Sequence, residues 1–229
     1  MPSCNHNQAV AMSVTKSGAA AGLFWLAGVV TLAVGAWVVC EIPHCGATPL
    51  DAAMMNWFAQ RRSVSGDLLF RTITWLGSIA ILVPLVVASM LILKFDRRIR
   101  EAYFLGTALV GIVVIMHLSK LLIARPRPAD AAALIDVPWD QSFPSAHSAQ
   151  IVSVLFGGVI VLGRSNRALS KWLLLLALPL ALLVGVSRIY LQVHYPTDVL
   201  VGMIMGLSWV TGLALWMFPP AKIRSDDHA

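Results

Sequence analysis

Residues 172–218 read WLLLLALPLALLVGVSRIYLQVHYPTDVLVGMIMGLSWVTGLALWMF, two long apolar runs joined by the polar stretch SRIYLQVHYPTD at 187–198. The joining stretch places Arg188, His194 and Asp198 at fixed intervals between the two runs. Because His194 and Asp198 are four residues apart, they share a face if they lie on one helical turn, and the carboxylate can then orient the imidazole. An Asp behind a His favours a base or a nucleophile, although a His at a membrane boundary is more often a packing residue.

The composition of the chain places these runs in a membrane. Of its 229 residues, 58% are AVILMFWYC and 12% are charged, whereas charged residues make up about 25% of an average soluble domain. The charges are clumped and leave apolar windows of about 17 to 25 residues, the length that crosses a hydrocarbon core as a helix. The first window is too long for the apolar region of a signal peptide, which has about 7 to 15 residues. The sequence predicts an all-α integral membrane protein, a six-transmembrane-helix bundle forming a single domain over residues 1–229, with spans at about 18–40, 73–93, 102–123, 147–163, 172–187 and 197–218.

Lysines and arginines between the windows predict the orientation of the bundle. Cations in short loops mark the cytoplasmic side of a membrane protein. By the order of the windows, the loops after the second and fourth spans share one side with both tails. The cations on that side are Lys16, Lys94, Arg97, Arg98, Arg100, Arg164, Arg167, Lys171, Lys222 and Arg224. We therefore expect a multi-pass protein of the cytoplasmic (inner) membrane whose termini are cytoplasmic.

The residues of the first outer loop predict a short helix within it. Thr48 is suited to cap a helix, Pro49 to its first position and Asp51 to its first turn. Four apolar residues then fall on one face, which fits a helix in the membrane interface and equally a loop helix packed on the core. These residues are Leu50, Met54, Trp57 and Phe58. Cys40 and Cys45 flank the start of the same loop and can form a disulfide if the chain turns between them.

The loop between the third and fourth windows emerges on the same side as SRIYLQVHYPTD. It begins with Lys120, continues through Arg125-Pro-Arg127-Pro128 and ends with Phe143-Pro144-Ser145-Ala146-His147. Each piece has an ordinary explanation, because cations at helix ends lie in the interface and a Ser caps a helix. Independent boundary residues have no reason to bring several cations and two histidines to one membrane face. That convergence is what a reaction on a phosphate ester needs, so we expect the active site on the extracytoplasmic (periplasmic) face.

Three motifs in this order resemble the signature of the phosphatidic acid phosphatase type 2 superfamily. They are Lys120-x6-Arg127-Pro128, Pro144-Ser145-Ala146-His147, and Ser187-Arg188-x5-His194-x3-Asp198. The third position of the middle motif is usually Gly in the family and is Ala146 here. An Ala is tolerated there if the backbone has a negative φ.

The resemblance and the residue chemistry imply the same substrate-binding residues. Lys120, Arg127 and Arg188 would bind the phosphoryl oxygens, the arginines by forked hydrogen bonds and the lysine as a point charge. Ser145 and the backbone amides at the start of the fourth span, including that of Ala146, would add donors at the positive end of a helix dipole.

Three further residues are predicted to carry the chemistry. His194 would attack phosphorus and form a phosphohistidine, with Asp198 fixing its tautomer. His147 would protonate the leaving oxygen and then act as base on the hydrolytic water. We expect no metal and no cofactor, because cations already neutralise the phosphate. The loop acids sit at irregular spacing for a metal site: they are Asp130, Asp136 and Asp140.

The sequence therefore predicts a membrane lipid phosphatase acting on a lipid phosphomonoester or diphosphate. Within the resemblance, undecaprenyl diphosphate is favoured over phosphatidylglycerol phosphate, phosphatidic acid and lipid A phosphates. Two rivals remain open: a phosphotransferase that passes the same phosphohistidine to an acceptor lipid, and a non-catalytic lipid-binding or transport protein. Membrane lipids are the expected surroundings. No basic patch interleaved with aromatic residues indicates a nucleic acid partner, and no oligomeric state is predicted.

Overall fold

The computed structural model describes residues 4–41, 44–128, 133–136 and 139–219. Asp130, Lys222 and Arg224 of the sequence analysis lie outside these ranges. The regular structure of the described chain is helical apart from one antiparallel pair of two-residue strands, β1 and β2. The elements are α1 (Cys4–Val39), β1 (Cys40–Glu41), β2 (His44–Cys45), α2 (Pro49–Ala59), α3 (Val64–Ile73), the 3-10 helix η1 (Thr74–Gly77), α4 (Ile79–Phe95), α5 (Ile99–Ile123), α6 (Ala146–Gly163), α7 (Arg167–Tyr190) and α8 (Pro196–Met217).

Five of these helices, α1 and α5 to α8, are each long and apolar enough to cross a membrane. A sixth span results if α3 with η1 and α4 count as one segment, which is bent by 45°. The prediction of an all-α membrane protein with a six-helix bundle is thus confirmed, and the chain is a multi-pass membrane protein.

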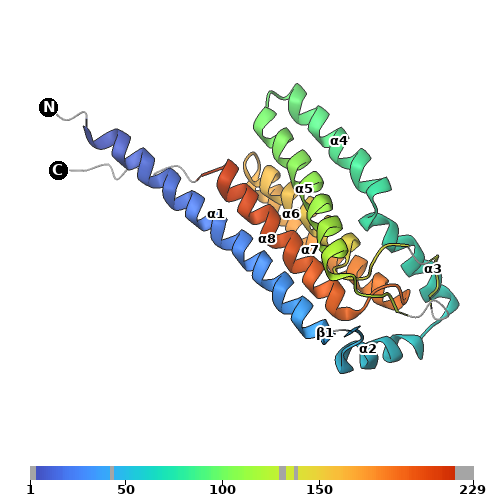
Figure 1. Ribbon diagram of the computed structural model, residues 1–229. Helices are drawn as coiled ribbons and strands as arrows, with labels where there is room; N and C mark the ends of the chain where they lie inside the picture. The colour runs from blue at the N-terminus through green and yellow to red at the C-terminus, as the bar shows by residue number, and fades with distance from the viewer. Residues whose placement is uncertain (1–3, 42–43, 129–132, 137–138, 220–229) are drawn as a thin grey trace.

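The helices form an elongated bundle in which α8 packs against α1 on one side and α6 on the other (Figure 1). The start of α1 and the end of α8 lie at one end of the bundle, as expected for an even number of crossings (Figure 1). The opposite end carries α2, α3, and the turn between α7 and α8 (Figure 1). The polar motifs of the sequence therefore meet at the end away from the termini.

The second span differs from its predicted range of 73–93. Its regular helix, α4, begins only at Ile79, because Ser78 has an extended backbone (φ −81°, ψ 150°) that ends the 3-10 turn η1. The reason is packing at Gly77. A Cβ there would lie 2.7 Å from Val184 Cγ1 and 3.1 Å from the His147 carbonyl oxygen, so the chain approaches α6 and α7 closely and turns. The bend carries Thr74 and Trp75 toward the polar end of the bundle.

The predicted helix in the first outer loop is confirmed as α2. Thr48 and Asp51 form a capping box, in which the Thr48 hydroxyl accepts from the Asp51 amide and the Asp51 carboxylate accepts from the Thr48 amide, each at 3.1 Å. Asp51 and Met55 face the bundle and are buried, whereas Leu50 and Trp57 remain exposed. The helix thus packs on the bundle with one face and presents apolar side chains outward with another. A disulfide between Cys40 and Cys45 closes the hairpin before it.

Helices α6 and α8 touch through their backbones beneath the polar end. Gly202 and Gly206 lie four residues apart on α8, a spacing that lets a neighbouring helix approach closely. A Cβ at Gly202 would lie 2.5 Å from the Ser145 carbonyl oxygen, and one at Gly206 would meet the Ala149 carbonyl oxygen still more closely. These glycines therefore set the distance between α8 and the start of α6.

Replacing Gly202 by Ala is expected to destabilise the protein by about 1–3 kcal/mol, because a backbone carbonyl cannot move aside as a flexible side chain can. Gly158→Ala on α6 is the matched control, since its Cβ would make an ordinary 3.7 Å contact with Leu173. Thermal unfolding in detergent measures both. Equal melting temperatures for the two variants would contradict this account of the α6–α8 contact.

Candidate active site

A cavity of about 240 Å³ at the polar end of the bundle brings most of the predicted site residues together. Five separate segments supply three cations and two histidines to its wall, which His117 and Asp140 also line. These three cations and two histidines are Lys120 near the end of α5, Arg127 in the following loop, His147 in the first turn of α6, Arg188 in the last turn of α7, and His194 in the turn before α8. Segments more than 70 residues apart in the chain thus share one wall, as expected if both polar loops lie on one membrane face.

His194 is held from both sides of its ring. Its Nδ1 lies 3.4 Å from Asp198 Oδ2 and 3.4 Å from Ser142 Oγ, while its Nε2 lies 3.1 Å from Arg127 Nη1. An arginine can only donate, so Nε2 carries the lone pair and Nδ1 carries the proton that faces the carboxylate. The lone pair of Nε2 therefore faces Arg127.

Asp198 is completely buried and accepts several hydrogen bonds. Its Oδ2 accepts from Ser142 Oγ at 2.5 Å and from the Tyr195 amide at 2.9 Å. Its Oδ1 accepts from Arg125. A carboxylate fixed at both oxygens presents one defined edge to His194, so it can hold the imidazole in a single orientation.

Lys120 and Arg127 share the carboxylate of Asp140. Asp140 Oδ2 lies 2.8 Å from Lys120 Nζ, and Asp140 Oδ1 lies 2.5 Å from Arg127 Nη2. Burial raises the pKa of Asp140, but the hydrogen bonds and charges of Lys120 and Arg127 outweigh it and hold the pKa below its usual value. Any anion that binds Lys120 and Arg127 must therefore compete with an ionised carboxylate.

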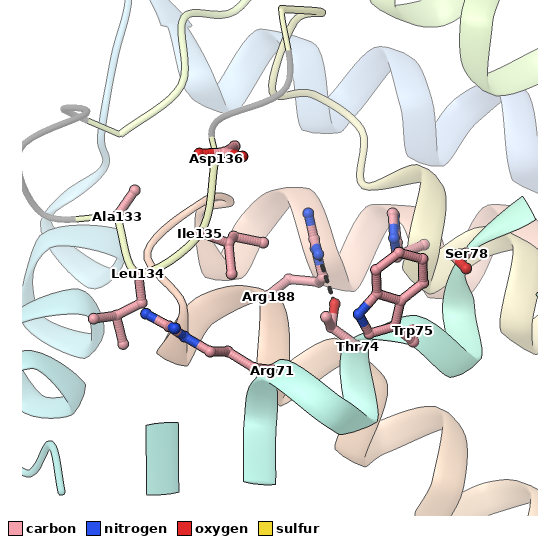
Figure 2. A pocket seen from close by; sticks show the side chains of 10 residues that line it. Arg71, Thr74, Trp75, Ser78, Ala133, Leu134, Ile135, Asp136 and Arg188 are labelled. Atoms are coloured by element: carbon pink, nitrogen blue, oxygen red, sulfur yellow. Dashed lines mark hydrogen bonds between the residues drawn. The ribbon is translucent and has the colours of Figure 1, made fainter. Parts of the chain in front are cut away.

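Arg188 is 2% exposed and borders two cavities. Its Nη1 donates to Thr74 Oγ1 at 2.6 Å, whereas its Nε has no hydrogen-bond partner within the described part of the chain. Figure 2 shows its guanidinium between Ile135 and Trp75, with the bond to Thr74 dashed. A buried arginine with an unused donor is suited to bind an anion.

The second cavity has a volume of about 1120 Å³ and adjoins the first along His147 and Arg188. Its wall combines polar and apolar side chains from α3, η1, the start of α4 and the loop that follows α5 (Figure 2). They include Arg71, Thr74, Trp75, Ser78 and Asp136. His147 thus lies where a group in the small cavity and a group in the large cavity would meet.

Ser145 and Ala146 occupy different places at the start of α6. Ala146 lines the small cavity and is the first residue of α6, a helical position that does not require glycine. Ser145 is completely buried, its amide donates to the Asp198 carbonyl oxygen at 3.0 Å, and its hydroxyl accepts from Ser148. The Ser145 amide therefore ties α6 to α8, and this residue lines neither of the two cavities.

Four residues that contact the site were given no role in it from the sequence. Arg125 was noted only as part of Arg-Pro-Arg-Pro, Asp51 only as a first-turn acid of α2, and Asp140 only as a poor metal ligand. Ser142 was not singled out. These residues contact partners on other helices and loops, which a local sequence pattern does not reveal. The one available signal was the Arg-Pro-Arg-Pro sequence that contains Arg125. Within the described ranges no three His, Cys, Asp or Glu side chains group closely enough to hold a metal ion.

The acid limb of the pH–rate profile is expected below pH 6.5. Burial, then the charges of Arg127, Lys120 and Arg188, hold the pKa of His194 well below its ordinary 6.5. A lowered pKa keeps His194 neutral and nucleophilic at pH values where a free imidazole is already protonated. The Arg127→Gln substitution removes one of these charges and is expected to raise the pKa of His194, so the acid limb moves to higher pH. Profiles of kcat/KM with one substrate test both statements, and an unchanged limb in Arg127→Gln would contradict them.

Known proteins are similar to this chain in sequence. The chain is 34% identical over 147 residues to an undecaprenyl-diphosphatase of Sulfolobus acidocaldarius, covering 62% of this chain and 66% of the relative. It is also 34% identical over 138 residues to phosphatidylglycerophosphatase B of Bacillus subtilis, covering 59% of this chain and 67% of the relative.

A solved structure agrees with the fold. The crystal structure of a transmembrane PAP2 type phosphatidylglycerolphosphate phosphatase from Bacillus subtilis superimposes with a TM-score of 0.71 at 25% identity, covering 82% of this chain and 92% of that one. The sequence pattern of the PAP2 superfamily matches residues 101–222, more than half of the chain and all three motifs. The protein therefore belongs to the PAP2 superfamily.

Proposed function

We propose that this protein is a lipid phosphatase that hydrolyses a lipid phosphomonoester or diphosphate through a phosphohistidine on His194. One observation carries the proposal: His194 and His147 line a single cavity with Lys120, Arg127 and Arg188. The cations bind the phosphoryl oxygens and stabilise the charge that develops on them in the transition state. The relatives named above act, by their names, on undecaprenyl diphosphate and phosphatidylglycerophosphate.

The first chemical step forms the phosphoenzyme. The lone pair on His194 Nε2 forms a bond to phosphorus while the bond from phosphorus to the leaving oxygen breaks. His147 gives its proton to that oxygen, so the leaving group departs as an alcohol or a protonated phosphate. The negative charge of the bound substrate offsets the three neighbouring cations and so favours the protonated form of His147. Asp198, facing the Nδ1 proton, stabilises the positive charge that the ring of His194 gains.

The second step reverses the roles. Neutral His147 takes a proton from water, the water oxygen bonds to phosphorus, and the bond from phosphorus to His194 Nε2 breaks. Inorganic phosphate leaves and both histidines return to their starting states. Asp140, which pairs with Lys120 and Arg127, competes with phosphate for these cations and thereby favours its release.

The two cavities divide the substrate between them. The small cavity holds His194 and takes the transferred phosphoryl group, whereas the large one lies beyond His147 and takes the leaving group. Attack and departure occur on opposite sides of phosphorus, which this division allows. Arg71 in the large cavity suits an anionic leaving group, such as the lipid monophosphate released from a diphosphate. Undecaprenyl diphosphate is therefore the substrate we place first.

We also propose where the protein lies in the cell and how it is oriented. The protein lies in the cytoplasmic (inner) membrane with cytoplasmic termini and its active site on the extracytoplasmic (periplasmic) face. Supporting it, the start of α1 and the end of α8 lie at the opposite end of the bundle from α3 and the turn between α7 and α8, which contribute residues to the cavities (Figure 1). The basic loops lie, by the order of the spans, on the side of the start of α1 and the end of α8. A site at the membrane boundary suits a substrate whose tail stays in the bilayer.

Phosphate release by the purified protein tests this function. The panel contains undecaprenyl diphosphate, undecaprenyl phosphate, phosphatidylglycerol phosphate and phosphatidic acid, and both free phosphate and phosphorylated lipid products are measured. We expect free phosphate from at least one of them. Label appearing on a second lipid would instead indicate a phosphotransferase, and no reaction with any lipid would support a binding or transport protein.

Chelators are expected to leave the activity unchanged, because side-chain cations alone neutralise the phosphate. Vanadate, which adopts the trigonal bipyramidal geometry of the transition state, is expected to inhibit. The measurement is phosphate release before and after EDTA treatment, with and without vanadate. If EDTA abolished the activity and added divalent metal restored it, the metal-free mechanism would be contradicted.

A further inference from the structure

Behind Asp198 lies a closed ionic cluster built from three distant segments. Arg125, in the loop after α5, is fully buried and stacks over the Tyr195 ring with its guanidinium carbon 4.1 Å from the ring centroid. Its Nη1 donates to Asp198 Oδ1 and, at 2.8 Å, to Thr197 Oγ1. Its Nη2 donates to Asp51 Oδ2 at 2.7 Å and to the Gly46 carbonyl oxygen at 2.6 Å.

Asp51 closes the cluster from α2. It is fully buried, and its Oδ1 accepts from the Thr197 amide at 3.0 Å while its Oδ2 accepts from Thr197 Oγ1 at 2.9 Å. Burial raises the pKa of Asp51, but the hydrogen bond from Arg125 and those from the Thr197 and Thr48 amides outweigh it and hold the pKa below its usual value. Asp51 is therefore ionised, and both carboxylates of the cluster face one guanidinium.

The cluster contains two carboxylates for one guanidinium. Arg125 and Asp198 alone would form a neutral pair, and a neutral pair stabilises a cation on His194 poorly. Asp51 places a second carboxylate on the far side of Arg125, so the guanidinium is shared between two carboxylates and is not neutralised by Asp198 alone. Removing one member of a buried ionic group leaves an uncompensated charge and costs more than an exposed pair would. The arrangement thus leaves Asp198 both fixed and electrostatically available to His194.

Neither Arg125 nor Asp51 lines the two cavities that hold His194 and His147. Neither contacts His194 directly. Arg125 donates to Asp198 Oδ1, the oxygen that does not face His194, and Asp51 in turn contacts Arg125. Partners at this distance from a catalytic group commonly change activity by about 10- to 100-fold.

We propose that Asp51 and Arg125 are positioning residues of the phosphatase site, which orient Asp198 and give it the charge that stabilises the phosphorylated, cationic His194. The inference rests on the proposed function and extends it to α2, a helix outside the three family motifs. Substrate binding depends on Lys120, Arg127 and Arg188, so it is left largely intact when Asp51 changes. The cluster acts on the formation of the phosphoenzyme.

Steady-state kinetics of Asp51→Asn test the proposal. The substitution keeps the shape of the side chain and removes its charge. We expect kcat to fall about 10- to 100-fold, with KM within about twofold of wild type. Thr48→Ala is the control, because it removes the hydroxyl that caps α2 without changing any charge in the cluster, and its kcat is expected to stay near wild type. Wild-type activity on the same substrate shows separately that the proposed function holds.

A double-mutant cycle separates positioning from a structural role. If Asp51 acts through Asp198, then Asp51→Asn has little further effect on kcat in an Asp198→Asn background. Equal falls in kcat in both backgrounds, or an unchanged kcat in folded Asp51→Asn, would overturn the proposal. If Asp51→Asn does not fold, Asp51→Glu keeps the charge and shifts its position. It is then expected to retain KM and lose kcat, and a wild-type kcat would overturn the proposal.

Discussion

Replacing His194 by Ala is expected to reduce phosphate release by about 10⁴-fold or more, because the nitrogen proposed to attack phosphorus is lost. His194 is 1% exposed and its Nε2 faces Arg127 Nη1 at 3.1 Å, so its ring has one accessible nitrogen, aimed into the small cavity. The measurement is free phosphate released from the best substrate of the lipid panel, followed over hours to quantify a slow residual rate.

His117→Ala is the matched control for this variant. It also removes an imidazole from the wall of the small cavity, but His117 is exposed on α5 and has no role in the proposed steps. We expect it to keep activity within about fivefold of wild type. Retained hydrolysis in folded His194→Ala would refute His194 as the nucleophile and leave His147 as the alternative.

Replacing Arg188 by Lys is expected to lower kcat/KM by about 10²- to 10³-fold, the cost of losing one preorganised donor to a transition-state oxyanion. A lysine keeps the positive charge but has a single nitrogen, so it cannot reproduce the planar fork in which Nη1 donates to Thr74 while the other nitrogens remain for phosphate. The assay is kcat/KM with the same lipid.

Arg71→Lys provides the comparison for Arg188→Lys. Arg71 lines only the large cavity and is exposed, so its contacts with the leaving group are less constrained. We expect its loss of kcat/KM to be smaller than that of Arg188→Lys. A larger loss for Arg71→Lys would contradict the assignment of the small cavity to the transferred phosphoryl group.

The sequence was sufficient for the architecture because membrane spans are a matter of apolar length. Helices α5, α6 and α8 begin and end within a few residues of their predicted windows. The second span was displaced because its bend depends on Gly77 meeting Val184 and His147, and contacts between distant segments leave no periodic signal. The capping residues of α2 were predictable because a capping box is local.

In the candidate site too, local motifs were predictable from the sequence, whereas contacts between distant segments were not. Motifs with fixed internal spacing indicated the residues that now share one cavity, among them Lys120, His147 and His194. The partners of those residues were not predictable, because they are chosen by tertiary contacts. Asp140 reaches Lys120 and Arg127 through the path of a loop, and Asp51 reaches Arg125 from another helix across 74 residues of sequence. Acidic residues in loops have many ordinary explanations, so their composition alone does not reveal such pairing.

The covalent intermediate is the claim on which the mechanism depends, and trapping it tests that claim most directly. His147→Ala lacks the base for the second step. An aryl phosphate, whose leaving oxygen needs little protonation, bypasses the acid needed in the first step. The phosphoenzyme should therefore accumulate when this variant reacts with a radiolabelled aryl phosphate that the wild type hydrolyses. We predict acid-labile, base-stable label on the peptide that contains His194. Label on another residue, or no label at any time during turnover, would contradict the account.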